Sequence, residues 1–452
     1  MDSDPKKLAD EARHSKARPV VSSILQDGTL LETLLRPEER RTLFCLEREG
    51  QIRYEENLLV DGERLVPYSP HNNLLRHDVV LLPSEPEEYG TEEELLADIR
   101  AFIHRYVDLS PAFETLTTYY VLLTWVYDAF AELPYLRVRG DYGSGKTRFL
   151  LTVGSLCYKP IFASGASTVS PLFRILDEFR GTLLIDEADF RLSDEKAEVV
   201  KILNNGHARG FPVLRSEATP SREFNPRAYA VFGPKLVATR GAFEDRALES
   251  RCLTEELGRG PLREGIPLNL PTSHREEALH LRNRLLLFRL RSFTKVGVNL
   301  APSDPSLEPR LNQILIPLLS VVSDETARQE LLALARDYQR AQVSERGADT
   351  DGQVLEVIRD LIAAGEERLS VKEITRSFVE RHGEEYERKV TAKYLGGIIR
   401  RRLHLRTRKS HGVFVIPPEE MPAVRWLFEK YGVPAPGTGT GDTPGSVSGG
   451  LV

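Results

Sequence analysis

The sequence predicts an α/β protein with a parallel-sheet core, a small mixed N-terminal region, a helical segment after the core and a further C-terminal domain. Short apolar runs alternate with helical patterns from 134 to about 257, which is typical of a parallel sheet with crossover helices. Residues 272–345 show helical periodicity throughout. Residues 351–416 indicate the order helix, short strand, helix, helix and hairpin.

The length of 452 residues corresponds to two to four domains at roughly 100–200 residues each. We expect a mixed α/β region at 1–92, the sheet core at 93–271, the helical segment at 272–348, a C-terminal domain at 349–432 and a disordered Gly/Ser/Thr/Pro-rich tail at 433–452.

Bulk properties exclude some classes of protein. The net charge is −6, so the chain is not a uniformly basic nucleic-acid coat, and any nucleic-acid surface must be local. The three cysteines lack CxxC spacing, which argues against a disulfide framework or a zinc site and favours the cytoplasm. The apolar stretch Tyr119–Leu136 contains Asp128 and Glu132, so we expect a buried helix and no membrane partner.

Individual elements follow from local signals. Asp61-Gly62 between two strand-like runs predicts a hairpin. Helical patterns cover about 92–107 and 111–131, and Ser273 with Glu276 has the pattern of a capping box. The expected core strands are Tyr135–Arg139, Pro160–Ala163, Thr182–Ile185, Lys235–Thr239 and Arg251–Thr254.

A glycine-rich loop carries the strongest chemical signal. Residues 140–147, Gly-Asp-Tyr-Gly-Ser-Gly-Lys-Thr, fit G-x-x-x-x-G-K-[ST] between a predicted strand and a predicted helix. Gly140, Gly143 and Gly145 let backbone N–H groups wrap a phosphate, with Ser144 in the same loop. Lys146 is expected to reach the β- and γ-phosphates of ATP, and Thr147 to bind Mg²⁺.

An acidic pair supplies the expected second half of this site. Asp186 and Glu187 follow the apolar run Thr182–Ile185. An acid at the carboxyl end of a parallel strand points into the ligand crevice. We expect Asp186 to hold Mg²⁺ and Glu187 to orient and polarise the attacking water.

The region after the acidic pair resembles the AAA+ ATPases. The polar Thr239 ends the fourth core strand, and Ala247-Leu-Glu-Ser-Arg251 is similar to a signature of minichromosome-maintenance helicases. The resemblance implies that Thr239 is sensor 1, although asparagine is commoner there. It also implies that Arg251 is an arginine finger acting on a neighbouring subunit, with Arg246 as the runner-up, and that Arg310 is a sensor 2 arginine in a helical lid.

A long connection between the acidic pair and sensor 1 adds a second likeness. The runs Val213–Ser216 and Ala228–Phe232 pair in our prediction around a tip that holds Arg222. This resembles the pre-sensor-1 hairpin clade of AAA+ proteins, which implies that Arg222 contacts DNA in a central pore. A plain edge hairpin with a solvated tip remains the alternative.

The C-terminal domain contains a local basic surface. Residues 388–409 hold nine Lys or Arg and no acid, and the expected DNA contacts are Lys389, Lys393, Arg400, Arg401, Arg406 and Arg408. Val390, Tyr394, Leu395, Ile398 and Ile399 form the expected buried face, with Gly396-Gly397 open to a phosphate backbone on the other side. The order of elements, with the strand Arg368–Val371 and a wing at His404–Ile416, resembles winged-helix DNA-binding domains. A solvated face, or one docked on protein, is the alternative.

Together these signals predict an ATPase that uses ATP and Mg²⁺, binds DNA and assembles with itself, by resemblance as a homohexameric ring. The first expected function is a self-loading replicative helicase or translocase of a bacterium or mobile element. A replication initiator or loader that oligomerises on DNA without translocating is the second. A protein-remodelling or defence ATPase is the third.

Overall fold

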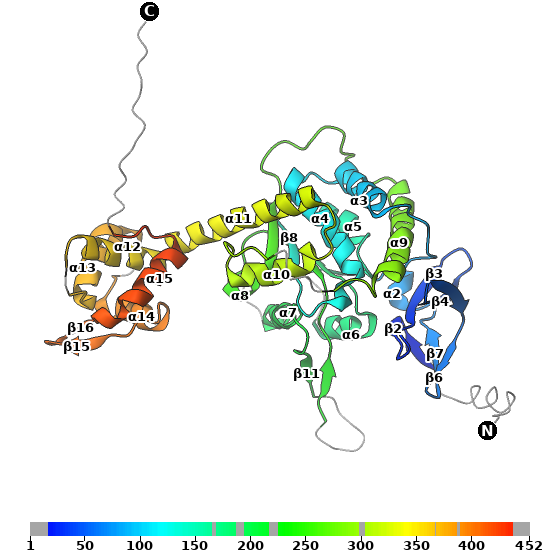
Figure 1. The fold of residues 1–452 in the computed structure, drawn as a ribbon, viewed down its shortest axis with the longest axis horizontal. Helices are drawn as coiled ribbons and strands as arrows, with labels where there is room; N and C mark the ends of the chain where they lie inside the picture. Colours follow the sequence, from blue (N-terminus) through cyan, green and yellow to red (C-terminus); the bar gives the residue numbers. More distant parts are fainter. Residues whose placement is uncertain are drawn as a thin grey trace, which may run out of the picture. The chain divides into compact units, whose positions relative to one another are not determined.

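The computed structural model describes residues 17–164, 169–186, 194–216, 225–297, 303–366, 368–386 and 389–436. The chain divides into two compact units, Met1–Ala335 and Arg336–Val452, and the division falls inside helix α11, Glu325–Ala348 (Figure 1). Among the described residues, no helix combines the length and the apolar character needed to cross a bilayer.

Strands dominate the N-terminal part of the first unit. One sheet has the order β1-β7-β6 and another the order β2-β3-β4-β5. The strands are β1 (Arg18–Val20), β2 (Ser22–Ile24), β3 (Leu30–Arg36), β4 (Arg41–Arg48), β5 (Gln51–Glu55), β6 (Leu58–Val60) and β7 (Glu63–Pro67), followed by the short helix α2 (Asn73–Arg76). The predicted hairpin at Asp61-Gly62 is confirmed, because β6 and β7 pair antiparallel with Val60 opposite Glu63.

The core of the first unit is a five-stranded sheet in the order β14-β8-β13-β10-β9, and every neighbouring pair is parallel. Its strands are β8 (Tyr135–Arg139), β9 (Ile161–Ser164), β10 (Leu183–Asp186), β13 (Lys235–Thr239) and β14 (Cys252–Glu256). The predicted α/β class is therefore confirmed. All five expected strands are present, and their ends differ from the expected ones by two residues at most.

Helices and one further hairpin complete the first unit. They are α3 (Glu92–Tyr106), α4 (Pro111–Trp125), the 3-10 turn η1 (Tyr127–Ala129), α5 (Lys146–Gly154), α6 (Val169–Phe179), α7 (Asp194–Asn205), β11 (Val213–Arg215), β12 (Arg227–Tyr229), α8 (Arg246–Glu249), α9 (Ser273–Ser292) and α10 (Pro309–Leu319). The predicted capping box at Ser273 is wrong: Thr272 is the N-cap of α9, it makes no side-chain cap hydrogen bond, and Ser273 is already helical.

A buried network of charges joins the N-terminal strands to the core. Arg289 of α9 donates from Nε to Glu32 of β3 at 2.7 Å and from both Nη atoms to Asp128 at 2.7 Å. The Tyr158 hydroxyl also donates to Glu32, at 2.6 Å. Because Glu32 and Arg289 are almost fully buried, each charge depends on the other for stability. The N-terminal strands are thus part of the same packed unit as the sheet.

The second unit is a small helical domain with one hairpin. Its elements after α11 are α12 (Thr350–Ala363), α13 (Val371–His382), η2 (Gly383–Glu385), α14 (Ala392–Arg401), β15 (Arg408–Ser410), β16 (Val413–Val415), η3 (Pro418–Glu420) and α15 (Met421–Tyr431). The expected strand Arg368–Val371 is only an isolated bridge between Ser370 and Val415. Ser370 instead caps α13, accepting the Glu373 N–H at 3.1 Å, and Val371 is the first helical residue.

Candidate nucleotide site and basic surface

The glycine-rich loop connects the carboxyl end of β8 to α5, which begins at Lys146. Gly143 and Gly145 have φ values of 73° and 94°, in the left-handed region that favours glycine. At Gly140 a Cβ atom would lie 2.6 Å from the Ser144 Oγ and 2.7 Å from the Leu257 carbonyl oxygen. Three glycines are therefore needed for the shape of this loop.

Lys146 lies inside the curve of the loop. Its Nζ donates to the carbonyl oxygens of Gly140 at 2.6 Å and Asp141 at 2.7 Å. Only 9% of Lys146 is exposed. A buried ammonium group held by carbonyl oxygens, with no carboxylate partner among the described residues, is well suited to receive an anion.

The loop and the acidic strand meet at one hydrogen bond. The Thr147 hydroxyl of α5 donates to Asp186 Oδ2 at 2.7 Å, although the two residues lie on different elements. A hydroxyl and a carboxylate oxygen side by side are ligands of the kind that Mg²⁺ prefers. Glu187, the expected water-orienting residue, lies outside the described residues.

Thr239 lies at the carboxyl end of β13, directly beside β8. It pairs with Arg139, and its carbonyl oxygen accepts the Gly140 N–H at 3.2 Å. Its side-chain hydroxyl is buried and has no hydrogen-bond partner among the described residues. Since buried polar atoms are rarely left unpaired, a group bound at the edge of the loop would give this hydroxyl a partner.

Sequence reasoning missed a neighbour of this site. Arg240 follows Thr239, and its guanidinium lies 3.9 Å from the ring centroid of Tyr142 in the loop. Tyr142 occupies a variable position of the motif and is 75% exposed. The only signal in the sequence was the position of Arg240 directly after the strand that ends in Thr239. This position does not predict that Arg240 contacts Tyr142.

Arg251 lies at the other end of the sheet. Its carbonyl oxygen accepts the Tyr135 N–H at the start of β8, so β8 separates it from the glycine-rich loop. Five residues of strand span about 16 Å at roughly 3.3 Å each. Arg251 donates to Asn204 Oδ1, its Nε has no partner among the described residues, and burial lowers its pKa, as does the charge of Arg310.

The other two predicted arginines, Arg310 and Arg246, lie nearer to Arg251 than to the glycine-rich loop of the same chain. Arg310 donates to Gln313 at 2.8 Å, and Gln313 donates to Glu132 before β8 at 2.8 Å. The structure thus brings Arg310 close to Arg251 and not to Lys146 of the same chain. Arg246 is the exposed first residue of α8.

The hairpin β11–β12 is present with the predicted antiparallel pairing, and Figure 1 shows it extending from the core near α6 and α7. Arg215 pairs with Glu198 of α7, and Arg227 lies 3.8 Å from both Asp177 and Glu178 of α6. These ion pairs hold the stem against the core. Arg222 of the expected tip lies outside the described residues.

The basic surface of the second unit lies on α14 and the β15–β16 hairpin. Lys389, Lys393, Arg400 and Arg401 are exposed, and none has a carboxylate partner in the described part of the chain. Arg406 and Arg408 lie 4.0 Å from Glu420 and 3.8 Å from Glu419. Lys389, Lys393, Arg400 and Arg401 are therefore the predicted contacts whose charge is available to an anion.

Two expectations about α14 are wrong. Tyr394, placed on the buried face, is 45% exposed, because it lies at the edge of the apolar stripe that Leu395, Ile398 and Ile399 form. Gly396 and Gly397, expected to be open to a phosphate backbone, are buried. A Cβ at Gly397 would lie 2.7 Å from an Arg401 nitrogen, so the long arginine side chains cover the glycines.

Comparison with protein families and with curated proteins gives no match. Among solved structures, the apo C-terminal region of NrS-1 has a TM-score of 0.36 at 11% identity, covering 85% of this chain and 96% of that one. SCCmec type IV Cch, an active helicase, has a TM-score of 0.41 at 11% identity, covering 91% and 81%. The Aeropyrum pernix Orc1 protein in complex with DNA has 0.22 at 15%, covering 73% and 95%. At these values the likeness assigns neither a family nor an activity.

Proposed function

We propose that this chain is an ATP-hydrolysing DNA motor of the AAA+ type, a self-loading helicase or translocase of bacterial or mobile-element replication. One observation carries the ATPase part: the Thr147 hydroxyl and Asp186 lie 2.7 Å apart beside Lys146. Two motifs that are distant in sequence thereby form one phosphate and metal site.

The residues present fit Mg²⁺ and a nucleoside triphosphate. The glycine-rich loop supplies N–H groups at a helix N-terminus, and Lys146 supplies a positive charge for the β- and γ-phosphates. Thr147 and Asp186 would hold Mg²⁺, which neutralises phosphate charge when bound. The free hydroxyl of Thr239 and the carboxylate of Glu187 would position water for attack on the γ-phosphate.

The proposal includes a neighbouring subunit. Arg251 and Arg310 lie at the end of the sheet opposite the loop, so they are placed to act on the site of another copy rather than on their own. A planar guanidinium stabilises the charge that spreads over the γ-phosphate oxygens during transfer. A closed homohexameric ring, as the AAA+ resemblance implies, would supply that geometry at each interface.

The DNA part of the proposal is carried by the basic surface. Four cations that have no carboxylate partner within the described ranges gather on one small domain in a chain of net charge −6. Such a local concentration is the electrostatic footprint of nucleic-acid binding. In this proposal α14 and the β15–β16 hairpin form a winged helix that binds duplex, and Arg222 at the tip of the β11–β12 hairpin contacts a strand.

ATP turnover measured with no DNA, with single strands and with duplex tests this function. We expect DNA to stimulate turnover, Lys146→Ala to abolish nucleotide binding, and Glu187→Gln to bind ATP without turning it over. A turnover that DNA leaves unchanged would favour the remodelling or defence ATPase. DNA stimulation without ATP-dependent strand separation in a gel assay would favour the initiator or loader.

A further inference from the structure

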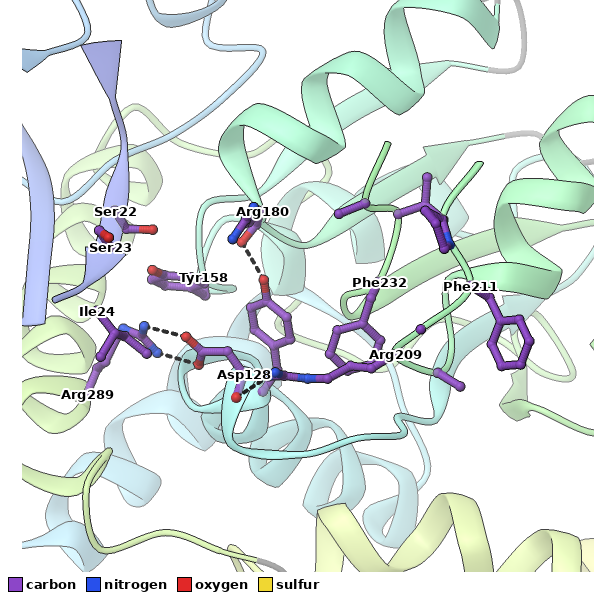
Figure 2. A pocket seen from close by; sticks show the side chains of 16 residues that line it. Ser22, Ser23, Ile24, Asp128, Tyr158, Arg180, Arg209, Phe211, Phe232 and Arg289 are labelled. Atoms are coloured by element: carbon purple, nitrogen blue, oxygen red, sulfur yellow. Dashed lines mark hydrogen bonds and ion pairs between the residues drawn. The ribbon is translucent and has the colours of Figure 1, made fainter. Parts of the chain in front are cut away.

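A pocket distinct from the glycine-rich loop lies between β2 and the base of the β11–β12 hairpin (Figure 2). Its volume is about 450 Å³, and no residue of the loop, nor Asp186 or Thr239, lines it. This volume falls within the range typical of sites for small organic ligands. The lining comes from the N-terminal strands, the loop after α6, the loop before β11 and α9.

Two arginines give the pocket a positive charge. Arg209 donates from Nε to the Phe130 carbonyl oxygen at 2.9 Å and also to the Asp128 carbonyl oxygen. Arg180 donates from Nε to the Asp177 carbonyl oxygen at 3.3 Å. Neither has a carboxylate partner among the described residues, whereas Arg289, the third arginine of the lining, is neutralised by Asp128 and Glu32. Two guanidinium groups are therefore available to an anion.

One aromatic ring lies next to Arg209, and a second lies farther along the pocket. The Arg209 guanidinium is 5.2 Å from the ring centroid of Phe232, and Figure 2 shows Phe211 on the side of Phe232 that faces away from Asp128. Phe211 is 64% exposed on a loop where Gly210 has a φ of 93°. A phenyl ring left in water at the rim of a pocket that two arginines also line has the character of a stacking surface for a base.

The backbone holds Arg180 in a costly conformation. Its φ is 47°, a left-handed value that non-glycine residues rarely adopt. The Tyr127 hydroxyl donates to the Arg180 carbonyl oxygen at 2.7 Å and thereby fixes this conformation. Strain of this kind persists where surrounding structure enforces it and is concentrated at ligand sites.

We propose that this pocket binds a nucleotide unit, with its phosphate held by Arg180 and Arg209 and its base stacked on Phe211. The unit could belong to a free nucleotide or to a single strand of nucleic acid. The single-strand form rests on the proposed DNA function, whereas the free-nucleotide form does not. In this proposal the pocket is a second nucleotide site, separate from the ATP site at the glycine-rich loop.

The experiment uses the full chain carrying Lys146→Ala, so that the glycine-rich loop does not bind the probes. Fluorescein-labelled oligothymidylate reports strand binding by anisotropy, and thymidine monophosphate reports free-nucleotide binding by calorimetry. We expect Phe211→Leu to weaken binding by about 5- to 150-fold, the loss expected for one base–aromatic stack. Arg180→Ala is expected to lower the salt slope of strand binding by about 0.7, the value for one phosphate contact on a single strand.

Matched controls separate the pocket from general surface effects. Leu214→Ala removes an equally exposed apolar side chain of β11 that does not line the pocket, at 63% exposure. Arg174→Ala removes an exposed positive charge from α6. Both should leave binding unchanged, and Phe211→Tyr should retain it.

The outcomes are distinct. Weakened oligothymidylate binding in both pocket variants supports the single-strand form, and weakened thymidine monophosphate binding alone supports the free-nucleotide form. Normal binding of both probes in properly folded Phe211→Leu and Arg180→Ala chains would overturn the proposal. Since the glycine-rich loop is disabled throughout, this result is independent of whether ATP turnover responds to DNA.

Discussion

At the scale of single residues, a substitution of Thr239 can distinguish a functional role of its side chain from a structural one. Its hydroxyl is buried without a hydrogen-bond partner in the described part of the chain, so it contributes nothing to stability that valine would not. Under the proposed function, its position beside Gly140 would let the hydroxyl contact bound nucleotide or the attacking water.

Thr239→Val should therefore slow ATP turnover by about 100-fold, the effect of removing one well-placed hydrogen-bonding group from a reacting centre. The midpoint of thermal unfolding should stay the same or rise, because no folded-state hydrogen bond is lost. Thr239→Ser keeps the hydroxyl and should retain most of the activity. Wild-type turnover in the valine variant would show that Thr239 is not sensor 1.

Lys235 offers a test of buried charge at the start of β13. It is fully buried, and its Nζ donates to the carbonyl oxygens of Gly233 at 2.7 Å and Val231 at 3.0 Å. Burial lowers its pKa from 10.5 to about 7. Between these two values the unfolded chain binds more protons than the folded chain, so the free energy of unfolding should rise with pH.

Urea unfolding at several pH values between about 7 and 10 measures this effect. The Lys235→Met variant should show a smaller rise, by up to about 1.4 kcal/mol per pH unit. Lys201→Met removes a lysine that is 66% exposed on α7 and should leave the rise as it is. Equal slopes in the wild type and Lys235→Met would mean that Lys235 stays protonated in the fold.

Sequence reasoning found the site residues whose relation is local. Lys146 and Thr147 belong to one motif, and Asp186 ends a parallel strand, so its carboxylate lies at the same edge of the sheet as the loop. It could not place Arg310, because lid and sheet meet through contacts such as Gln313 with Glu132 that no sequence spacing encodes.

At the scale of elements, the core strands were predictable because short apolar stretches alternate with helical patterns along this part of the chain. The ends of elements were less predictable. The strand expected at Arg368–Val371 does not form, because Ser370 caps α13 and Val371 is already helical. The basic character of α14 was also readable, but its two glycines were misplaced because the arginine side chains fold back over them.

The exposed cations of α14 and of the segment just before it give a quantitative prediction about DNA. Changing Lys389, Lys393 and Arg400 to alanine should lower the slope of log affinity against log salt by about 2.7, at roughly 0.9 for each phosphate contact. Affinity should fall equally for all duplex sequences, since phosphate contacts carry no base information. Fluorescence anisotropy on a short duplex at several salt concentrations measures both.

A matched triple variant in the same unit provides the control. Arg359 and Arg381 share Asp360, and Arg376 lies near both Glu373 and Glu380, so three carboxylates accompany these three positive charges. Replacing them by alanine should leave the salt slope nearly unchanged. A slope that the first triple variant also leaves unchanged would indicate that the basic surface is solvated or docked on protein.

At the scale of the whole molecule, the sheet separates two groups of residues that the proposed function assigns to one catalytic site. The loop lies at the carboxyl end of β8 and Arg251 beside its amino end, so under the proposed function Arg251 would act on the loop of a neighbouring copy. No local sequence signal predicts this separation, since it depends on the edge strand β14 pairing with β8.

Arg251→Ala should accordingly leave ATP affinity near that of the wild type and lower turnover by about 10³-fold or more, because a finger acts on charge that develops during transfer. Arg246→Ala is the matched comparison, as the exposed arginine of the neighbouring helix.

Mixing Arg251→Ala chains with Lys146→Ala chains tests whether Arg251 acts on its own chain or on a neighbouring copy. Each variant alone is inactive, but a mixed assembly contains interfaces where an intact loop faces an intact Arg251. Turnover should return in proportion to such interfaces, whereas a mixed assembly of verified composition without any recovery would place the action of Arg251 within its own chain.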